Sequence, residues 1–180
     1  MLPHEHLFQR LKDVAAISAL INTTEDLHLD CKTWPSRDDD AQRMLAKALC
    51  AFANADGGVV VIGLDARGGP NKDEPDLIHA AAPVSDAIAV KSRIENLTGE
   101  IVEPRVEGVH LAIVPDSMGS SSGFVIVNVP PTEGLPCRSR KDWKFYQRIS
   151  AGTDPMEYSQ IADMFGRRRR PVLSLFLYGG

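Results

Sequence analysis

Asp30 and Lys32 are separated by one residue in a segment where apolar and polar residues alternate. Leu27, Leu29 and Cys31 supply the apolar positions, which predicts a strand with one buried face and places the acid and the lysine together on the other face. A carboxylate that holds Mg²⁺ or Mn²⁺, next to a cation that positions water or contacts phosphate, suits metal-dependent cleavage of a phosphodiester. Taken alone, the triplet is common by chance and is more simply an ordinary exposed ion pair on a strand.

Two further acidic residues make the metal hypothesis more specific. Glu25 lies just before this strand, and Asp65 follows the apolar run 59–62, which predicts a central strand covered on both faces. If Glu25, Asp30 and Asp65 converge to about 5 Å, each pair repels by roughly 3 kcal/mol at an effective dielectric constant of about 20. A divalent cation, raised carboxylate pKa values or the charge of Lys32 would compensate. Of these the cation implies a function, and a set of carboxylate oxygens favours Mg²⁺ or Mn²⁺ over zinc.

Hydrophobic periodicity predicts the elements that must position these residues. Strands are expected over 27–32, 59–62, 106–114, 123–129, 143–149 and 172–178, and helices over 4–21, 38–52, 85–97 and 157–165. Residues 66–83 are rich in Gly, Pro and Asp, which favours a long surface loop, and the three strands between 106 and 149 are expected to form a meander. The order of elements predicts the α/β (α+β) class, with a mixed β-sheet flanked by helices.

Composition limits the class of protein. The chain has 180 residues, 43% of them hydrophobic, which is enough for one domain with its own core. No apolar run approaches the roughly 20 residues of a membrane span, and residues 1–6 lack the layout of a secretory signal. The odd number and wide spacing of the cysteines argue against a disulfide framework and a cysteine zinc site, so a cytoplasmic location is expected. They are Cys31, Cys50 and Cys137.

The charge of the chain is unevenly distributed. The net charge is −4, but residues 135–170 carry nine basic and four acidic groups, so this segment is at +5 and the rest at −9. Cations interleaved with Trp143 and Tyr146 suit phosphate contact and base stacking, whereas the alternative places Trp143 in the core and leaves ordinary solvated charge. The candidate nucleic-acid-binding residues are Lys32, Arg43, Lys47, Arg138, Arg140, Lys141, Lys144 and Arg148.

Three blocks of the sequence resemble the Schlafen AlbA-type domain family. They are residues 25–32 (EDLHLDCK), residues 51–65 with AFANADGG and VIGLD, and residues 145–165, which begin FYQRISAGT. The resemblance covers about residues 20–166, so we divide the chain into an N-terminal helix (1–21), a Schlafen AlbA-like domain (22–166) and a basic tail with a strand (167–180). Two interpretations of the tail stay open: an added edge strand, or the start of a region removed from a longer, membrane-directed protein.

The resemblance implies a domain that handles nucleic acid. In eukaryotic members a three-acid site cleaves transfer and ribosomal RNA with a divalent metal, while many prokaryotic members are described as DNA-binding or regulatory modules. By position, Glu25, Asp30 and Asp65 take the three acidic roles and Lys32 the basic one. This chain has Asp30 where Glu is common, and Ala66 where a further acid is frequent.

These observations lead to one main hypothesis and two alternatives. The main hypothesis is an endoribonuclease that depends on Mg²⁺ or Mn²⁺ and acts on transfer-RNA-like RNA, with RNA favoured over DNA as partner. Its metal ligands are Glu25, Asp30 and Asp65, and Lys32 contacts phosphate or water. The alternatives are a non-catalytic DNA-binding or transcription-regulatory module and an interaction domain without nucleic acid. The family also implies a homodimer with the groove between two copies, since eukaryotic cores place two related lobes around RNA.

Overall fold

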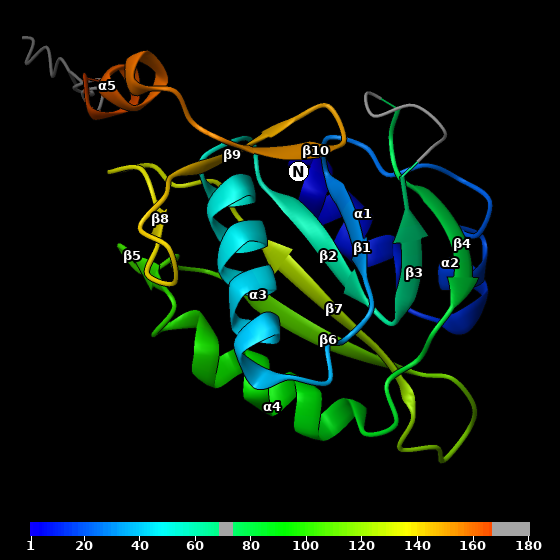
Figure 1. Cartoon of the computed structure of the whole chain (residues 1–180). Helices are drawn as coiled ribbons and strands as arrows, with labels where there is room; N and C mark the ends of the chain where they lie inside the picture. Colours follow the sequence, from blue (N-terminus) through cyan, green and yellow to red (C-terminus); the bar gives the residue numbers. More distant parts are fainter. Residues whose placement is uncertain (69–73, 167–180) are drawn as a thin grey trace, which may run out of the picture.

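A four-stranded mixed sheet forms the centre of the molecule, here a computed structural model that describes residues 1–68 and 74–166 (Figure 1). Its strand order is β1-β2-β7-β6; β1 is parallel to β2, and the other neighbours are antiparallel. The strands are β1 (Leu29–Lys32), β2 (Gly58–Ile62), β6 (His110–Pro115) and β7 (Gly123–Val129). The arginine run 167–170 and the expected strand 172–178 lie outside the described residues.

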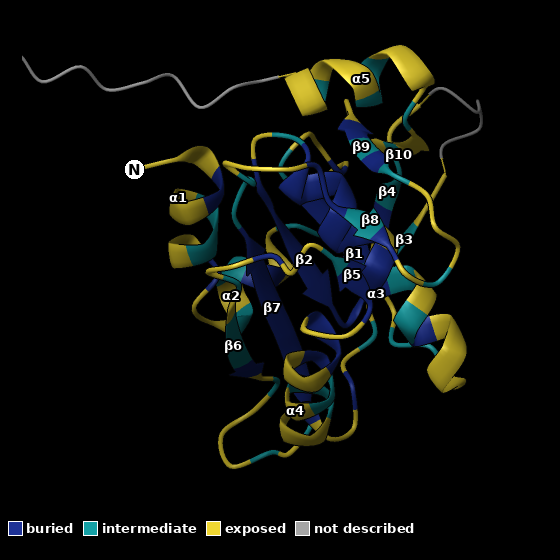
Figure 2. Cartoon of the chain, turned by 90° about the vertical axis from the view of Figure 1, so that its left-hand side faces the viewer, coloured by how far each residue is buried: buried dark blue, intermediate teal, exposed yellow. Residues whose placement is uncertain are grey.

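Both faces of the sheet are covered, because alternate residues of β2 belong to different hydrophobic clusters. Val60 and Ile62 pack with α3 (Asp38–Ala53) and α4 (Ala87–Thr98), whereas Val59 and Val61 pack with residues from the N-terminal helices. Those helices are α1 (Pro3–Arg10) and α2 (Val14–Ser18). Figure 1 shows α3 in front of the sheet and α1 behind it, and Figure 2 shows β2 and β7 buried along their length. The expected α/β fold with a mixed sheet and flanking helices is confirmed.

Helix α3 begins and ends where the sequence predicts. Three aspartates at residues 38–40 occupy its first turn, where negative charge is favourable against the helix dipole. Asn54 is the C-cap, and Gly57 then adopts a positive φ of 78°. A Cβ atom at Gly57 would lie 2.6 Å from the His4 ring and 2.9 Å from the Val129 carbonyl oxygen, so glycine is required both for its conformation and for this close approach of β2 to α1.

Three two-stranded ladders and a helix complete the described chain. They are β3 (Leu64–Arg67) with β4 (Leu77–Ala81), β5 (Val102–Glu103) with β8 (Arg138–Ser139), β9 (Tyr146–Ile149) with β10 (Gly152–Pro155), and α5 (Tyr158–Gly166). Within residues 1–68 and 74–166, no helix has the length and apolar character needed to cross a bilayer.

Three expectations about these elements are wrong. The segment expected to be one long loop contains β3 and β4, which form an antiparallel hairpin. The expected meander is limited to β6 and β7, because β9 pairs with β10 rather than with β7. The expected helix 4–21 is two helices, since Asp13 caps α2 by accepting a hydrogen bond from the Ala16 N–H and so starts a new helix.

Candidate functional site

Glu25 and Asp30 place two carboxylates in the interior, with only 3% and 4% of their surface exposed. Asp30 lies on the α3 side of β1 because its neighbours Leu29 and Cys31 fill the hydrophobic cluster on the other side. Glu25 precedes β1, and its Oε1 accepts a hydrogen bond of 2.7 Å from the Cys31 N–H. Strand alternation thus directs Asp30 to the α3 side of β1, and the backbone contact fixes Glu25 at the open edge of the same strand.

Arg148 of β9 is the buried cation that joins these acids. Its Nη1 donates to Asp30 Oδ1 at 3.0 Å, and its Nη2 lies 3.5 Å from Glu25 Oε2. The guanidinium also donates to the carbonyl oxygens of Leu29 at 2.6 Å and Asp26 at 3.0 Å. The planar group thus finds acceptors in several directions, which a buried charge needs. The expectation that Arg148 belongs to an open basic surface is wrong, because its side chain is 2% exposed.

Lys32 forms the solvent side of the same cluster. Its Nζ is 2.7 Å from Asp30 Oδ1 and 3.5 Å from Glu25 Oε1, and about a third of its side chain, 32%, is exposed. Two acids therefore face two bases. We call Glu25, Asp30, Lys32 and Arg148 the acid–base cluster. It lines a pocket of about 550 Å³, whose wall also includes residues of α3, of β10 and of the segment 74–76.

Burial and the neighbouring charges shift the pKa values of Glu25 and Lys32. It raises the pKa of Glu25 from 4.5 to about 7, and the Asp30 carboxylate adds to this effect, while Lys32, the Cys31 N–H and Arg148 oppose it. For Lys32, burial alone would lower the pKa, but the carboxylates of Asp30 and Glu25 outweigh it and the pKa is raised. The pocket wall therefore carries a carboxyl group that exchanges its proton near neutral pH and a lysine that stays charged.

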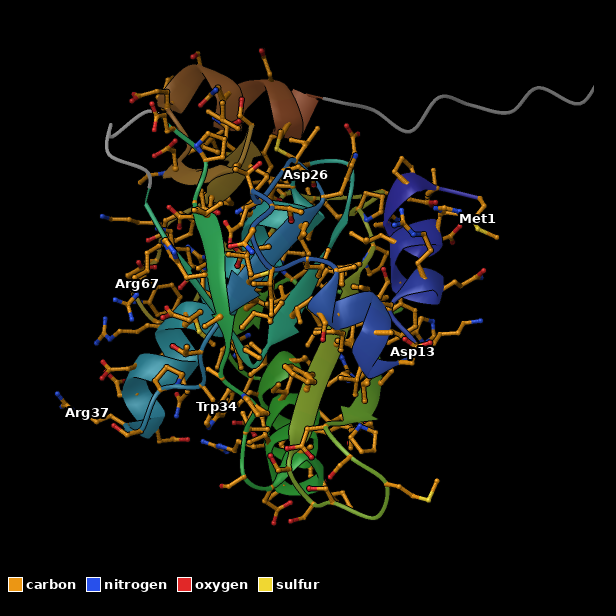
Figure 3. All side chains as sticks on the ribbon, turned by 90° about the vertical axis from the view of Figure 1, so that its right-hand side faces the viewer. Met1, Asp13, Asp26, Trp34, Arg37 and Arg67 are labelled. Atoms are coloured by element: carbon orange, nitrogen blue, oxygen red, sulfur yellow. The ribbon has the colours of Figure 1, made fainter. Side chains whose placement is uncertain are left out.

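Asp65 is not brought to this pocket. After β2 the chain turns at Gly63, with φ of 112°, so Asp65 lies in the β3–β4 hairpin rather than at the end of the central strand. Its carboxylate is bound by Arg67, with Oδ2 2.6 Å from Nη2 and Oδ1 3.1 Å from Nε, and this hydrogen bonding lowers the pKa of Asp65. Figure 3 shows the Arg67 side chain on the outside of the molecule, away from Asp26. The expected convergence of three acids is therefore limited to Glu25 and Asp30.

The cluster does not fit a resident divalent metal ion as it is arranged. No group of three or more His, Cys, Asp and Glu side chains in the described ranges could hold a metal ion. The carboxylate oxygens of Glu25 and Asp30 already contact Lys32 and Arg148. A Mg²⁺ or Mn²⁺ ion would have to displace one of these cations and then share a confined space with the other, which Coulomb repulsion opposes.

Cations from two distant parts of the chain meet on one face. Lys141 donates to Gln42 Oε1 of α3 at 2.9 Å and lies 3.0 Å from Asp39 Oδ1, so the β8–β9 segment is fastened to α3. We call this surface the α3–β8 face; its cations are Arg43, Lys47, Arg138, Arg140, Lys141 and Lys144. Several are paired with carboxylates at the surface, Arg43 with Asp39, and Arg138 and Arg140 with Glu103.

Trp143 is the exposed aromatic residue of this face. It has 60% of its surface accessible, which excludes the alternative that it lies in the core. The Arg138 guanidinium lies 4.9 Å from the centre of its ring. Lys47 lies 5.6 Å from the Tyr146 ring and also lines the pocket of the acid–base cluster, so the face and the pocket are continuous along α3.

Two residues that build the site, Phe52 and Asn54, are not among those predicted from the sequence. Phe52 of α3 packs beneath the Arg148 guanidinium, 5.2 Å from ring centre to Cζ. The Asn54 amide donates to the carbonyl oxygens of Cys137 at 2.7 Å and Tyr146 at 2.8 Å, and accepts from the Cys137 N–H at 2.6 Å. Both belong to the Ala-Phe-Ala-Asn stretch on which the family resemblance rests. That resemblance is the signal in the sequence that could have identified them as site residues.

The fold and the site define an α/β domain with a buried acid–arginine cluster beside a face rich in cations. Residues 25–157 match the family model described as Schlafen, AlbA_2, and the chain belongs to this family. The comparison with curated proteins found no match.

Two solved structures are similar to this chain. The DIP2311 protein from Corynebacterium diphtheriae has a TM-score of 0.52 and 13% identity over 93% of this chain, which shows a shared fold; the chain spans 29% of that protein. The N-terminal domain of an ATP-dependent DNA helicase RecG-related protein from Nitrosomonas europaea has a TM-score of 0.45 and 17% identity, covering 73% of this chain and 82% of that domain.

Proposed function

We propose that this domain binds single-stranded segments of nucleic acid, with RNA preferred to DNA, across the α3–β8 face. The observation that carries the proposal is the contact of Lys141 with α3, because it unites the cations of residues 138–144 with Arg43 and Lys47 beside the exposed Trp143. Membership of the Schlafen AlbA_2 family supports nucleic acid as the polyanion. The preference for RNA rests on the family resemblance.

The chemistry of the face suits a flexible strand. Lysine and arginine side chains contact phosphates without reading the sequence, and an exposed indole stacks on a base of any identity. Surface ion pairs contribute only about 0–1 kcal/mol each, so Arg138 and Arg140 can exchange Glu103 for a phosphate at little cost. A face with such contacts gives affinity that falls steeply with salt and depends little on base sequence.

Metal-dependent cleavage is not part of this proposal. In the acid–base cluster, Lys32 and Arg148 occupy the carboxylates that a divalent ion would need, and Asp65 is bound to Arg67. The cluster instead fixes β1 against β9, and through Lys32 it adds a cation to the pocket that adjoins the face. The homodimer expected from the family stays a prediction.

One experiment separates binding from cleavage. Fluorescent single strands of RNA and DNA with the same sequence, and the RNA duplex, are titrated with the protein at several salt concentrations, and each mixture is then incubated with Mn²⁺ and analysed for fragments. We expect saturable, salt-dependent binding, tightest for single-stranded RNA, and intact strands. Absence of binding at low salt overturns the proposal. Fragments that vanish with Asp30→Asn, in a variant that still unfolds cooperatively in urea, would establish the nuclease hypothesis instead.

A further inference from the structure

Two buried thiols lie in contact at the C-terminal end of α3. The Sγ atoms of Cys50 and Cys137 are 3.2 Å apart although the residues are separated by 87 positions in the chain. Both cysteines are free, and their exposed fractions are 0% and 1%. The wide spacing of the cysteines concealed this pair, which only the fold brings together.

The backbone around the pair is held in place from both sides. Asn54 lies one helical turn after Cys50, and its side chain makes two hydrogen bonds with the backbone of Cys137, one to the carbonyl oxygen at 2.7 Å and one from the N–H at 2.6 Å. The same amide also binds the Tyr146 carbonyl oxygen at 2.8 Å. The two sulfur atoms are therefore kept at contact distance by an independent clamp, which gives the second thiol a high effective concentration.

We propose that Cys50 and Cys137 are a site of reversible oxidation, at which an intrachain disulfide fastens the last turn of α3 to the segment that leads into β8. A disulfide bond is about 2.0 Å long, so the sulfur atoms must approach by about 1.2 Å. Cys31 cannot take part, because it lies on the opposite side of the sheet, in the other hydrophobic cluster.

The surroundings also favour an order for the two sulfur atoms when the oxidant is a peroxide. Cys137 is among the residues around a cavity of about 860 Å³, and Cys50 is not. The Cys137 sulfur attacks one peroxide oxygen, the O–O bond breaks, the leaving hydroxide takes up the thiol proton and departs as water, and Cys137 becomes a sulfenic acid. The Cys50 sulfur then attacks the Cys137 sulfur, the S–O bond breaks, and a second water leaves with the Cys50 proton. Two electrons pass from the two sulfurs to the peroxide.

The surroundings of the pair make this oxidation slow. The hydrogen bond with Cys137, together with burial, raises the pKa of Cys50, so little Cys50 thiolate exists at neutral pH and its attack on the Cys137 sulfenic acid is slow. The site therefore differs from an activated peroxidase thiol and is suited to sustained oxidation. The inference does not rest on nucleic-acid binding, although the disulfide would link the two halves of the α3–β8 face.

The test uses the full chain. Reduced protein is incubated with hydrogen peroxide, remaining thiols are alkylated under denaturing conditions, and peptides are mapped by mass spectrometry without reduction. We expect one intrachain Cys50–Cys137 linkage, one alkylated thiol at Cys31, and a melting temperature higher by roughly 10 °C that a phosphine reductant reverses. The Cys31→Ala variant is the matched control, and it should form the same linkage.

Other products overturn the proposal. Three alkylated thiols after the peroxide has been consumed, a linkage that includes Cys31, or a disulfide between two chains would each contradict an intrachain pair. With Cys50→Ala, peroxide should convert Cys137 to sulfinic acid instead of a disulfide. If that variant does not fold, the Cys31→Ala protein still tests the proposal. Its two remaining thiols either form the Cys50–Cys137 disulfide or are both alkylated, and the second result contradicts the proposal.

Discussion

Arg148 and Asp30, which are 118 positions apart, are joined in the interior by a hydrogen bond of 3.0 Å between Nη1 and Oδ1. The contact connects β9 to β1 across the end of α3, and Glu25 and Lys32 complete it. Removing one member of a buried charged group leaves the others without compensation, which costs more than the group contributed when intact. The acid–base cluster therefore holds β9 against β1, and its residues form part of the wall of the adjoining pocket.

Replacing Arg148 should lower the stability of the folded protein far more than replacing an exposed arginine. Arg148→Met leaves the Glu25 and Asp30 carboxylates buried with Lys32 as their remaining cation, so we expect the free energy of unfolding to fall by about 3–5 kcal/mol in urea denaturation. Arg140→Met is the control, because Arg140 is exposed and 3.8 Å from Glu103; its effect should stay within about 0.5 kcal/mol. Equal stability of the two variants would contradict the structural role of the cluster.

The raised pKa of Glu25 should make stability depend on pH. Because the folded protein holds this proton up to about pH 7 and the unfolded chain releases it near 4.5, the folded state binds more protons between these values, and stability falls as pH rises through this window. Relative to Glu25→Gln, the wild type should lose about 3 kcal/mol between pH 4.5 and 7. Parallel urea denaturation curves of both proteins measure this difference, in which the other titrating groups cancel. A constant difference across the window would show that Glu25 keeps an ordinary pKa.

Trp143 should contribute to binding by stacking on a base. We expect Trp143→Ala to weaken binding of single-stranded RNA about tenfold, within the range of about 1–3 kcal/mol for one stacked base, while Trp143→Phe retains part of the affinity. Tyr158→Ala is the control, since Tyr158 is an exposed aromatic residue of α5 outside the α3–β8 face. Fluorescence anisotropy at fixed salt measures all four proteins. An equal loss in the two alanine variants would remove the stacking role.

The family resemblance also predicts that the protein is a homodimer. If two copies form a groove, light scattering at tens of micromolar should give twice the chain mass, and added RNA should not change the number of chains in the particle. A mass of one chain over this range would leave each α3–β8 face to act alone. The binding proposal survives that result, because all cations of the face come from one chain.

The sequence predicted elements well where one local pattern decides. The spacing of apolar residues locates helix α3, which buries one face, and the continuous apolar run locates strand β2, which is covered on both faces. The predicted position of Asp65 at the end of the central strand is wrong, because the chain turns at Gly63 and leaves the central sheet for the β3–β4 hairpin. No local pattern in the sequence distinguishes this turn from a continuation of the central strand.

The position of Arg148 shows a different limit. Along β9, Tyr146 and Arg148 are buried while Ile149 is exposed, the reverse of what hydropathy favours. Only the presence of Glu25 and Asp30 beneath β9 makes the arginine the inward residue, and that depends on contacts more than a hundred positions apart. A single sequence carries the residues of such a cluster but not their convergence.

The most direct test of the account reverses charge on the α3–β8 face. We expect Lys141→Glu with Lys144→Glu to weaken single-stranded RNA binding at least tenfold and to make the slope of log affinity against log salt shallower by about one to two. The control pair, Arg10→Glu with Lys12→Glu, adds the same charge beside α1 on the other side of the sheet, and it should change affinity much less. Equal losses in the two pairs, or an unchanged affinity in the first, would contradict the claim that this face binds nucleic acid.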